Sequence, residues 1–167
     1  GIGDIVVEGG TVSSFTGSGT SYSATFTPSG GDGLKRVRVA DNVFVDAAGN
    51  GNNASNTFEW TYDSTPPIIT ISSSDVSEDS TSNDDNVQFT FTTSEDTSNF
   101  GIGDIVVEGG TVSSFTGSGT SYTATFTPSG GDGMKRVSVA ADAFTDAAGN
   151  GNVASNTFEW TIFNDYV

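Results

Sequence analysis

Two stretches decide the fold: VQFTFT at residues 87–92 and YTATFT at residues 122–127. In both, every second residue is apolar and the residues between are polar. Successive side chains of a β-strand point to opposite faces, so this period of two predicts strands that bury one face and expose the other to water. Leu occurs once in the chain and the 22 glycines favour tight turns, so we expect essentially no helix.

Five more short segments of the same character surround these two, at residues 68–72, 105–108, 112–115, 136–139 and 158–162. The glycine-rich GSGT at 117–120 is expected to form a turn between two of them. Seven short strands within residues 65–167 fit an all-β, immunoglobulin-like sandwich of two packed sheets with Greek-key connections. Its expected core is Val87, Phe89, Phe91, Ile105, Val107, Tyr122, Ala124, Phe126, Val137, Val139, Phe158 and Trp160. Among the aromatic residues, Phe100, Phe144 and Tyr166 are the main ones expected outside inward positions.

The first 62 residues repeat the part of this domain that begins at Gly101. Residues 1–62 and 101–162 are identical at 53 positions, and the differences, such as Leu34 against Met134, are scattered. The chain therefore contains two tandem copies, and the paired prolines at 66–67 are expected to hold an extended linker between them. We assign residues 1–64 to a partial repeat and residues 65–167 to a complete repeat.

The first copy lacks counterparts of the two strands at 68–72 and 87–92. Five strands alone would leave an open sheet edge and an uncovered apolar face. Two explanations are open at this stage: the chain was cut from a longer array, which is favoured, or strands from a neighbouring chain complete the first domain by strand addition.

Charge and composition exclude several classes of function. Twenty-one acidic residues against five basic ones give a net charge of −16, which disfavours binding to nucleic acid or anionic membrane surfaces. The apolar runs are too short for membrane insertion as a helix. Without cysteine or histidine, disulfides and thiol or imidazole catalysis are impossible. A carboxylate pair such as Glu95 with Asp104 is the remaining catalytic option, and loop acids without catalytic function are the favoured interpretation, so we expect no enzyme.

Three segments carry a family resemblance: residues 91–130, the VSVAADAFTDAAGNGN stretch at 137–152, and the linker TYDSTPP at 61–67. They resemble the bacterial Ig-like repeats of giant secreted adhesins and hemagglutinin-like surface proteins. The resemblance implies a secreted or bacterial cell-surface location, neighbouring repeats of the same chain as partners, and a long stalk that is often stiffened by calcium between domains.

The acidic residues are expected to gather at the two poles of the sandwich, because alternate loops of this fold share a pole. The pole near the preceding domain would hold Asp63, Glu95, Asp96, Asp104, Asp142 and Asp146, with Asn150 beside them. The opposite pole would hold Asp75, Glu78, Asp79, Asp84, Asp85 and Asp132. Like charges at this spacing repel by about 1 kcal/mol per pair in water, and Ca²⁺ takes six to eight oxygen ligands in irregular geometry. We therefore expect a calcium site at the near pole, against the alternative of solvated loop acids.

Three functions follow from these observations. The first is a calcium-stiffened stalk or filament segment, which the inward placement of nearly all aromatic residues favours. The second is a ligand-binding module for carbohydrate or ice. A row of threonines on the exposed faces of three strands motivates the ice surface: Thr70, Thr90, Thr92, Thr123, Thr125 and Thr127. The third is a filament subunit completed by strands from another chain.

Overall fold

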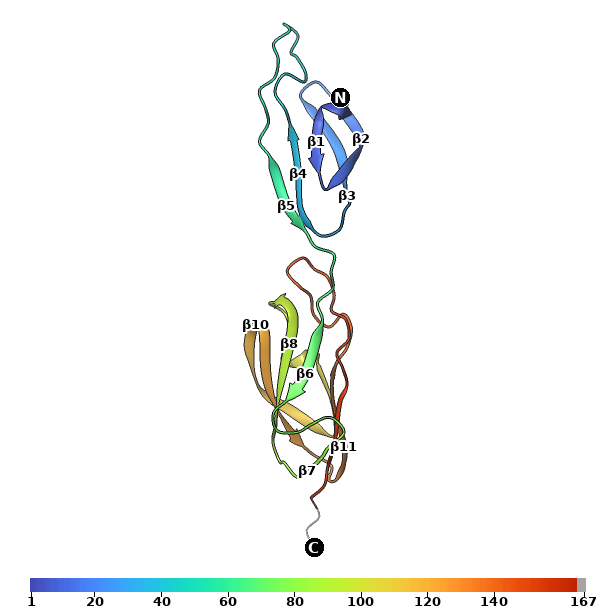
Figure 1. Ribbon diagram of the computed structural model, residues 1–167, viewed down its shortest axis with the longest axis vertical. Coiled ribbons are helices and arrows are strands. Elements are labelled where there is room, and N and C mark those ends of the chain that lie inside the picture. Colours follow the sequence, from blue (N-terminus) through green and yellow to red (C-terminus); the bar gives the residue numbers. More distant parts are fainter. Residues whose placement is uncertain (165–167) are drawn as a thin grey trace. The chain divides into compact units, whose positions relative to one another are not determined.

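A computed structural model describes residues 1–164 and places the chain in two compact units. Unit 1 comprises Gly1–Thr65 and unit 2 comprises Pro66–Val167 (Figure 1). Both are built of β-strands, and their only helical segments among the described residues are two short 3-10 turns, η1 and η2. The all-β fold class is thereby confirmed.

Unit 2 is a sandwich of two sheets. Its elements are β6 (Ile69–Ser73), β7 (Thr81–Ser82), β8 (Val87–Thr97), η2 (Ile102–Asp104), β9 (Ile105–Glu108), β10 (Gly110–Pro128), β11 (Gly133–Val139) and β12 (Phe158–Ile162). One sheet has the order β10-β8-β6 and the other the order β7-β12-β11-β9. All pairs are antiparallel except β7 with β12. The period-two sequence therefore places its apolar side chains between the two sheets.

The core of unit 2 lies between these sheets and contains the expected residues. Trp160, Phe89 and Phe126 are at most 1% exposed and pack as tilted or edge-to-face rings. Eleven of the twelve core residues expected from the sequence are buried, and the twelfth, Val107, is half-buried. Ile69, Ile71, Val76, Phe100, Phe144 and Ile162 complete the core.

Phe100 and Phe144 correct the sequence-based prediction, which placed them outside. They are 5% and 1% exposed, and their ring centroids lie 5.1 Å apart. Both residues lie in loops, where no strand alternation marks a side chain as inward. The sandwich needs these rings because its end between the two sheets would otherwise be open to water. Tyr166 lies outside the described residues.

Some strand boundaries match the expectation and others depart from it. β9 and β12 have the expected limits, whereas β8 continues to Thr97 and β11 begins at Gly133. β10 runs without interruption through residues 117–120, where the sequence predicts a turn. Gly117, at φ +134°, allows the backbone to bend there without leaving the strand. The two-residue β7 has no signal in the sequence.

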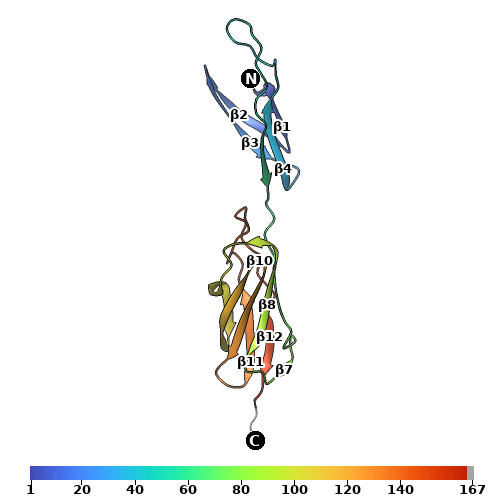
Figure 2. The same ribbon diagram turned by 90° about the vertical axis from the view of Figure 1, so that its left-hand side faces the viewer.

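Unit 1 repeats only part of this architecture (Figure 2). Its elements are η1 (Ile2–Asp4), β1 (Ile5–Glu8), β2 (Gly10–Ser18), β3 (Ser21–Pro28), β4 (Gly33–Val39) and β5 (Phe58–Tyr62). They form one sheet of order β1-β4-β5 and a separate hairpin of β2 and β3. Counterparts of β6 and β8 are absent from residues 1–65, so no strand pairs with the outer edge of β3 within the described unit.

A buried lysine closes the turn after the long hairpin in both units. Lys135 is 3% exposed, and its Nζ donates hydrogen bonds to the carbonyl oxygens of Ser129 and Gly131 at 2.8 and 2.9 Å. Gly109 lies against it at φ +77°, where an added Cβ would come within 2.6 Å of the lysine Cδ. Lys35 makes the same contacts in unit 1. The ammonium group is thus satisfied by backbone carbonyls in both copies.

Candidate functional site

The N-terminal pole of unit 2 is the end at which the chain enters it, made of Pro67–Ile68, the end of β8 and the loop 140–157. The entering segment is hydrogen-bonded to this pole at two points. The N–H of Val153 donates to the carbonyl of Pro67 at 2.9 Å, and the N–H of Ile68 donates to Ser94 Oγ at 2.8 Å. The incoming chain is therefore anchored from its second proline onward.

Asp146 organises the loop of this pole. Its Oδ1 accepts the N–H groups of Ala148 and Asn150, both at 2.9 Å, and its Oδ2 accepts Asn150 Nδ2 at 3.0 Å. The hydrogen bonds from Asn150 lower the pKa of the Asp146 carboxyl, although partial burial opposes them. The side chain is thus ionised at neutral pH and shapes the DAAGNGN loop from within. Asp46 makes the same bonds in unit 1, where it is exposed.

Glu95 and Asp146 are the two predicted calcium ligands that the fold of unit 2 brings together. A carboxylate oxygen of each lies within 4.8 Å of the other. Glu95 lies near the end of β8, and Thr97 holds that strand to the loop because its Oγ1 donates to the carbonyl of Thr145 at 2.8 Å. Ca²⁺ takes six to eight oxygen ligands, so the two carboxylates alone cannot complete its coordination shell. The Asp146 oxygens also accept three hydrogen bonds already.

The other predicted ligands of unit 2 have different surroundings. The Asp104 carboxylate accepts the N–H of Gly101 at 2.8 Å and so begins the turn η2. Asp142 is exposed and has a backbone φ of +58°. Burial of the Tyr122 ring raises the pKa of its hydroxyl, and the charge of Asp96 adds to this effect. Among the described residues, Asp96, Asp104 and Asp142 are not part of the carboxylate group that includes Glu95.

Asp63, the remaining predicted ligand, belongs to the end of unit 1. It precedes Pro66, the first residue of unit 2, by three positions. Its Oδ1 accepts the N–H of Thr65 at 3.0 Å.

Asp32 anchors the segment that leaves unit 1, a role that the sequence did not reveal. Its Oδ1 accepts the N–H of Ser64 at 2.8 Å and the Ser64 hydroxyl at 2.7 Å, while its Oδ2 accepts the Thr65 hydroxyl. These bonds, led by the one from Thr65, lower the Asp32 pKa to about 2. In unit 2, Asp132 accepts the N–H of Asn164 at 2.8 Å in the same way.

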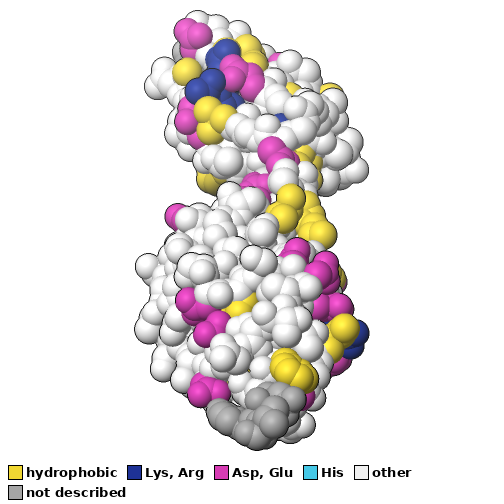
Figure 3. Space-filling model, turned by 60° about the horizontal axis from the view of Figure 1, so that its bottom comes forward, with side chains coloured by type: hydrophobic (Ala, Val, Ile, Leu, Met, Phe, Trp, Pro, Cys, Tyr) yellow, Lys and Arg dark blue, Asp and Glu magenta, His cyan; other side chains and the backbone are white. Residues whose placement is uncertain are grey.

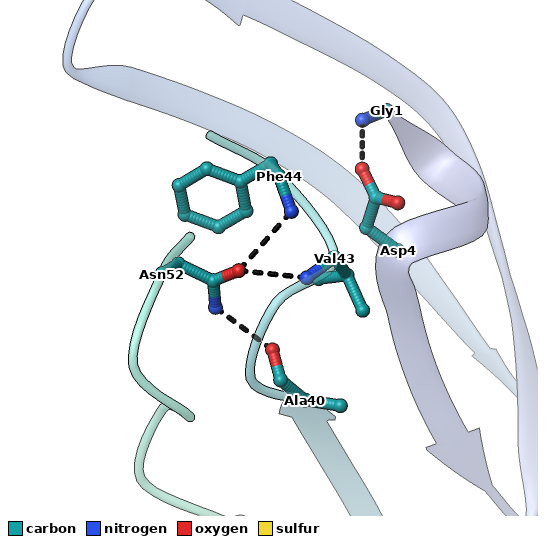
Figure 4. Close-up of polar contacts among 6 residues, drawn as sticks. All are labelled: Gly1, Asp4, Ala40, Val43, Phe44 and Asn52. Atoms are coloured by element: carbon teal, nitrogen blue, oxygen red, sulfur yellow. Dashed lines mark hydrogen bonds and ion pairs between the residues drawn. The ribbon is translucent and has the colours of Figure 1, made fainter. Parts of the chain in front are cut away.

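Asn152 is a second residue that sequence reasoning missed. It is 2% exposed, its Oδ1 accepts the N–H groups of Ala143 and Phe144, and its Nδ2 donates to the carbonyls of Ala140 and Val153. All four hydrogen-bonding positions of the amide are used, which fixes the long loop at its base. Figure 4 shows the equivalent Asn52 of unit 1. Nothing in the sequence distinguishes it, because nearly every residue is repeated.

Ion pairs are few on this acidic molecule. Arg136 binds Glu108 and Glu159 at 2.9 and 2.8 Å across three strands, and Arg36 binds Glu8 and Glu59 in the same way. Figure 3 shows dark-blue basic side chains lying beside magenta acidic ones, with further acids spread over the visible face. These exposed pairs contribute little stability, and the excess negative charge remains.

The threonine row lies on the outer face of the β10-β8-β6 sheet, as expected. Thr70 is paired with Thr92, and Thr90 with Thr123. Several hydroxyls already have partners in the protein: Thr125 Oγ1 accepts Gln88 Nε2 at 2.6 Å, and the Oγ1 atoms of Thr116 and Thr123 lie 3.1 Å apart. An ice-binding role for this face remains a hypothesis.

In the described part of the chain, no helix has the length and apolarity needed to cross a membrane. A comparison with curated proteins gave no match. Among solved structures, FdeC, an adhesin of Escherichia coli, is similar at 18% identity and a TM-score of 0.46, over 97% of this chain and 52% of that one. This chain therefore spans about half the length of that structure.

The family comparison covers almost the whole chain. The profile of the bacterial Ig-like domain matches twice, at residues 1–62 and again at residues 63–162. The second match agrees with the two-sheet architecture of unit 2, and the first covers the strands of unit 1. The chain belongs to the family of bacterial Ig-like domains.

Proposed function

We propose that the chain is a segment of an extracellular bacterial stalk, in which Ig-like domains act as stiff spacers. The observation that carries the proposal is the anchoring of the connecting segment at both of its ends. Ser64 and Thr65 are hydrogen-bonded to Asp32 in unit 1, and Pro67 and Ile68 are hydrogen-bonded to unit 2. Only Pro66 lies between the two anchors, and its ring restricts φ. Such a connection supports a spacer with little freedom to bend.

A calcium ion at the N-terminal pole of unit 2 is the second part of the proposal. Glu95 and Asp146 would supply carboxylate oxygens, and Asp63 would supply a third carboxylate from the connecting segment. Asp146 is already ionised and held in place, so binding would require little reorganisation of that side chain. The ion would offset the repulsion between these acids and fasten the connecting segment to the pole.

A stalk is favoured over a carbohydrate-binding module because unit 2 offers few rings to a sugar. Phe163 is the only aromatic side chain of its described residues with a largely exposed surface, at 53%. Phe100 and Phe144, which the sequence placed outside, are buried.

The experiment measures bending and stability in calcium and in chelator. The chain contains no cysteine, so Ser13→Cys and Ser113→Cys place one spin label on an exposed strand position of each unit. We expect a narrow distance distribution between the labels in calcium and a broader one in chelator. Calcium at about 100 times its Kd should raise the stability of the folded state by about 2.7 kcal/mol.

Glu95→Gln should remove both effects of calcium, and Asp85→Asn at the opposite pole is the control with the same change in charge. Equal behaviour in the two buffers would refute the calcium site. A broad distribution in both buffers would refute the stiff spacer itself, so the two parts of the proposal fail separately.

A further inference from the structure

The DAAGNGN loop of unit 2 contains an asparagine followed by a glycine, Asn150–Gly151, close to the proposed calcium ligand Asp146. Asn50–Gly51 is the equivalent pair of unit 1, and no other asparagine of the chain precedes a glycine. Such a pair is chemically reactive. The glycine nitrogen can attack the side-chain amide carbon of the asparagine because no Cβ of the glycine stands in the way.

Both members of the pair have a structural partner in the loop. Asp146 accepts the backbone N–H of Asn150 at 2.9 Å and its Nδ2 at 3.0 Å, and we call these two bonds the Asp146 clamp. Gly151 lies against the side chain of Asp142, where an added Cβ would come within 2.1 Å of Oδ1. The loop therefore favours asparagine at 150 and glycine at 151 for its own conformation, and the reactivity of the pair follows from that choice.

We propose that Asn150 is a site of spontaneous deamidation, restrained by the Asp146 clamp. The Gly151 nitrogen forms a bond to Cγ of Asn150 and loses its proton, the Cγ–Nδ2 bond breaks, and the amide nitrogen leaves as ammonia. Water then opens the resulting succinimide ring at either of its two carbonyls, which gives aspartate or isoaspartate at position 150. The net reaction consumes one water and releases one ammonia.

The nucleophile and water both have access to this position. The N–H of Gly151 donates no hydrogen bond among the described residues, because the bonds that close the loop come from the N–H groups of Asp146 and Asn152. Residues 147–149 are exposed and Asn150 is half-buried, so solvent reaches the amide.

The clamp is what opposes the reaction. Cγ of Asn150 reaches the Gly151 nitrogen only when the side chain turns back over its own backbone carbonyl. Its Nδ2 must leave Asp146 Oδ2 for this to happen. Loops open locally without unfolding of the whole domain, so deamidation should proceed slowly from such openings.

A carboxylate at position 150 would change the charge of the N-terminal pole, and this consequence rests on the proposed function. The donor that Asp146 Oδ2 accepts would be replaced by a group of like charge, so the clamp would become repulsive without a cation. The new carboxylate would also offer oxygens beside Glu95 and Asp146. Because the number of charged ligands tunes calcium affinity, the deamidated chain should bind calcium about tenfold more tightly.

The test incubates the full chain in chelator, in mildly alkaline water enriched in heavy oxygen, and follows position 150 by peptide mass spectrometry. We expect incorporation of heavy oxygen and a mixture of aspartate and isoaspartate, since the succinimide route yields both and direct hydrolysis of the amide yields aspartate alone. Asn152 and Asn156, which precede valine and threonine, are internal controls and should stay unmodified.

Two variants separate the clamp from the stability of the domain. Asp146→Ala should raise the rate at Asn150 about tenfold, because hydrogen bonds that hold the side chain are lost. Asn156→Ala removes the bonds to Ile71 and leaves the clamp intact, so the rate should not change. Absence of isoaspartate at position 150 even in Asp146→Ala would overturn the proposal. Equal acceleration by both variants would overturn the role of the clamp.

Asn150→Asp tests the consequence for the pole separately. Its melting temperature should lie below that of the unmodified chain in chelator, and calcium should offset the loss. Asn83→Asp, an exposed position with the same change in charge, is the control and should not alter the response to calcium. A loss that calcium leaves unchanged would refute the calcium site of the proposed function, whereas the isoaspartate measurement alone decides the deamidation.

Discussion

Units 1 and 2 have almost the same sequence from their first 3-10 turn onward, yet their apolar residues have different environments. Phe44 is 55% exposed and Phe144 is 1% exposed, although the loops around them are hydrogen-bonded in the same way by Asn52 and Asn152. The difference is the pair β6 and β8, which only unit 2 has. Burial is therefore set by the partner strands, whereas the local conformation is set by the segment itself.

Local hydrogen bonds explain why the exposed copy keeps its conformation. The aspartate in the DAAGNGN loop, the buried lysine and the three-strand arginine pairs all join residues within the repeated part. None of them needs β6 or β8. The comparison thus separates the contributions to stability that come from within residues 1–62 from those that β6 and β8 add in unit 2.

The largest expected effect that tests this comparison is the truncation of one ring in each unit. Phe158→Ala should destabilise unit 2 by about 3 to 5 kcal/mol, because it removes a core ring that contacts Phe89 and Trp160. Phe58→Ala should change the stability of unit 1 by at most about 0.5 kcal/mol, as expected for an exposed side chain. Urea unfolding followed by tryptophan emission reports on both units, since each has one tryptophan. Equal losses would mean that unit 1 is covered in solution.

An intermediate effect is expected from the asparagine that binds strand β6. Asn156→Ala should cost about 1 to 3 kcal/mol, because the N–H and carbonyl of Ile71 lose their partner at a part-buried position. Asn56→Ala should be nearly neutral in the chain alone. Hydrogen exchange of the Ile71 amide is the direct measurement, and unchanged protection in Asn156→Ala would contradict the assignment.

The smallest effect concerns the anchor at the end of unit 1 and its dependence on pH. Folding lowers the Asp32 pKa from its ordinary 3.8 to about 2, so the unfolded chain takes up this proton first as the pH falls. The stabilisation is therefore complete above about pH 4 and is lost progressively towards pH 2. Carboxyl NMR should show Asp32 titrating near pH 2, with faster exchange of the Ser64 amide below that pH. An ordinary titration midpoint would contradict the anchor.

Much of the fold could be predicted from the sequence, and less of the candidate site. The short segments expected at 105–108 and 158–162 have the limits of β9 and β12, and the alternating strands identified the core around Trp160. The pole was also identified, and Glu95 and Asp146 do approach each other there. Asp96, Asp104 and Asp142 belong to the same loops but have separate surroundings. The loop in which a residue lies does not determine where its side chain points. The direction depends on local turns, such as the one in which the Asp104 carboxylate accepts the N–H of Gly101.

The sequence by itself determined the tandem repeat, the strands and the inward face of each, because alternation and identity are properties of the linear order. Only the tertiary structure decided which inward faces are covered and which polar groups meet. Phe100 and Phe144 became core residues, Asn156 came to bind Ile71 from 85 positions away, and Phe58 stayed exposed. These outcomes depend on contacts between segments distant in sequence, and a local pattern does not specify which distant segments pack together.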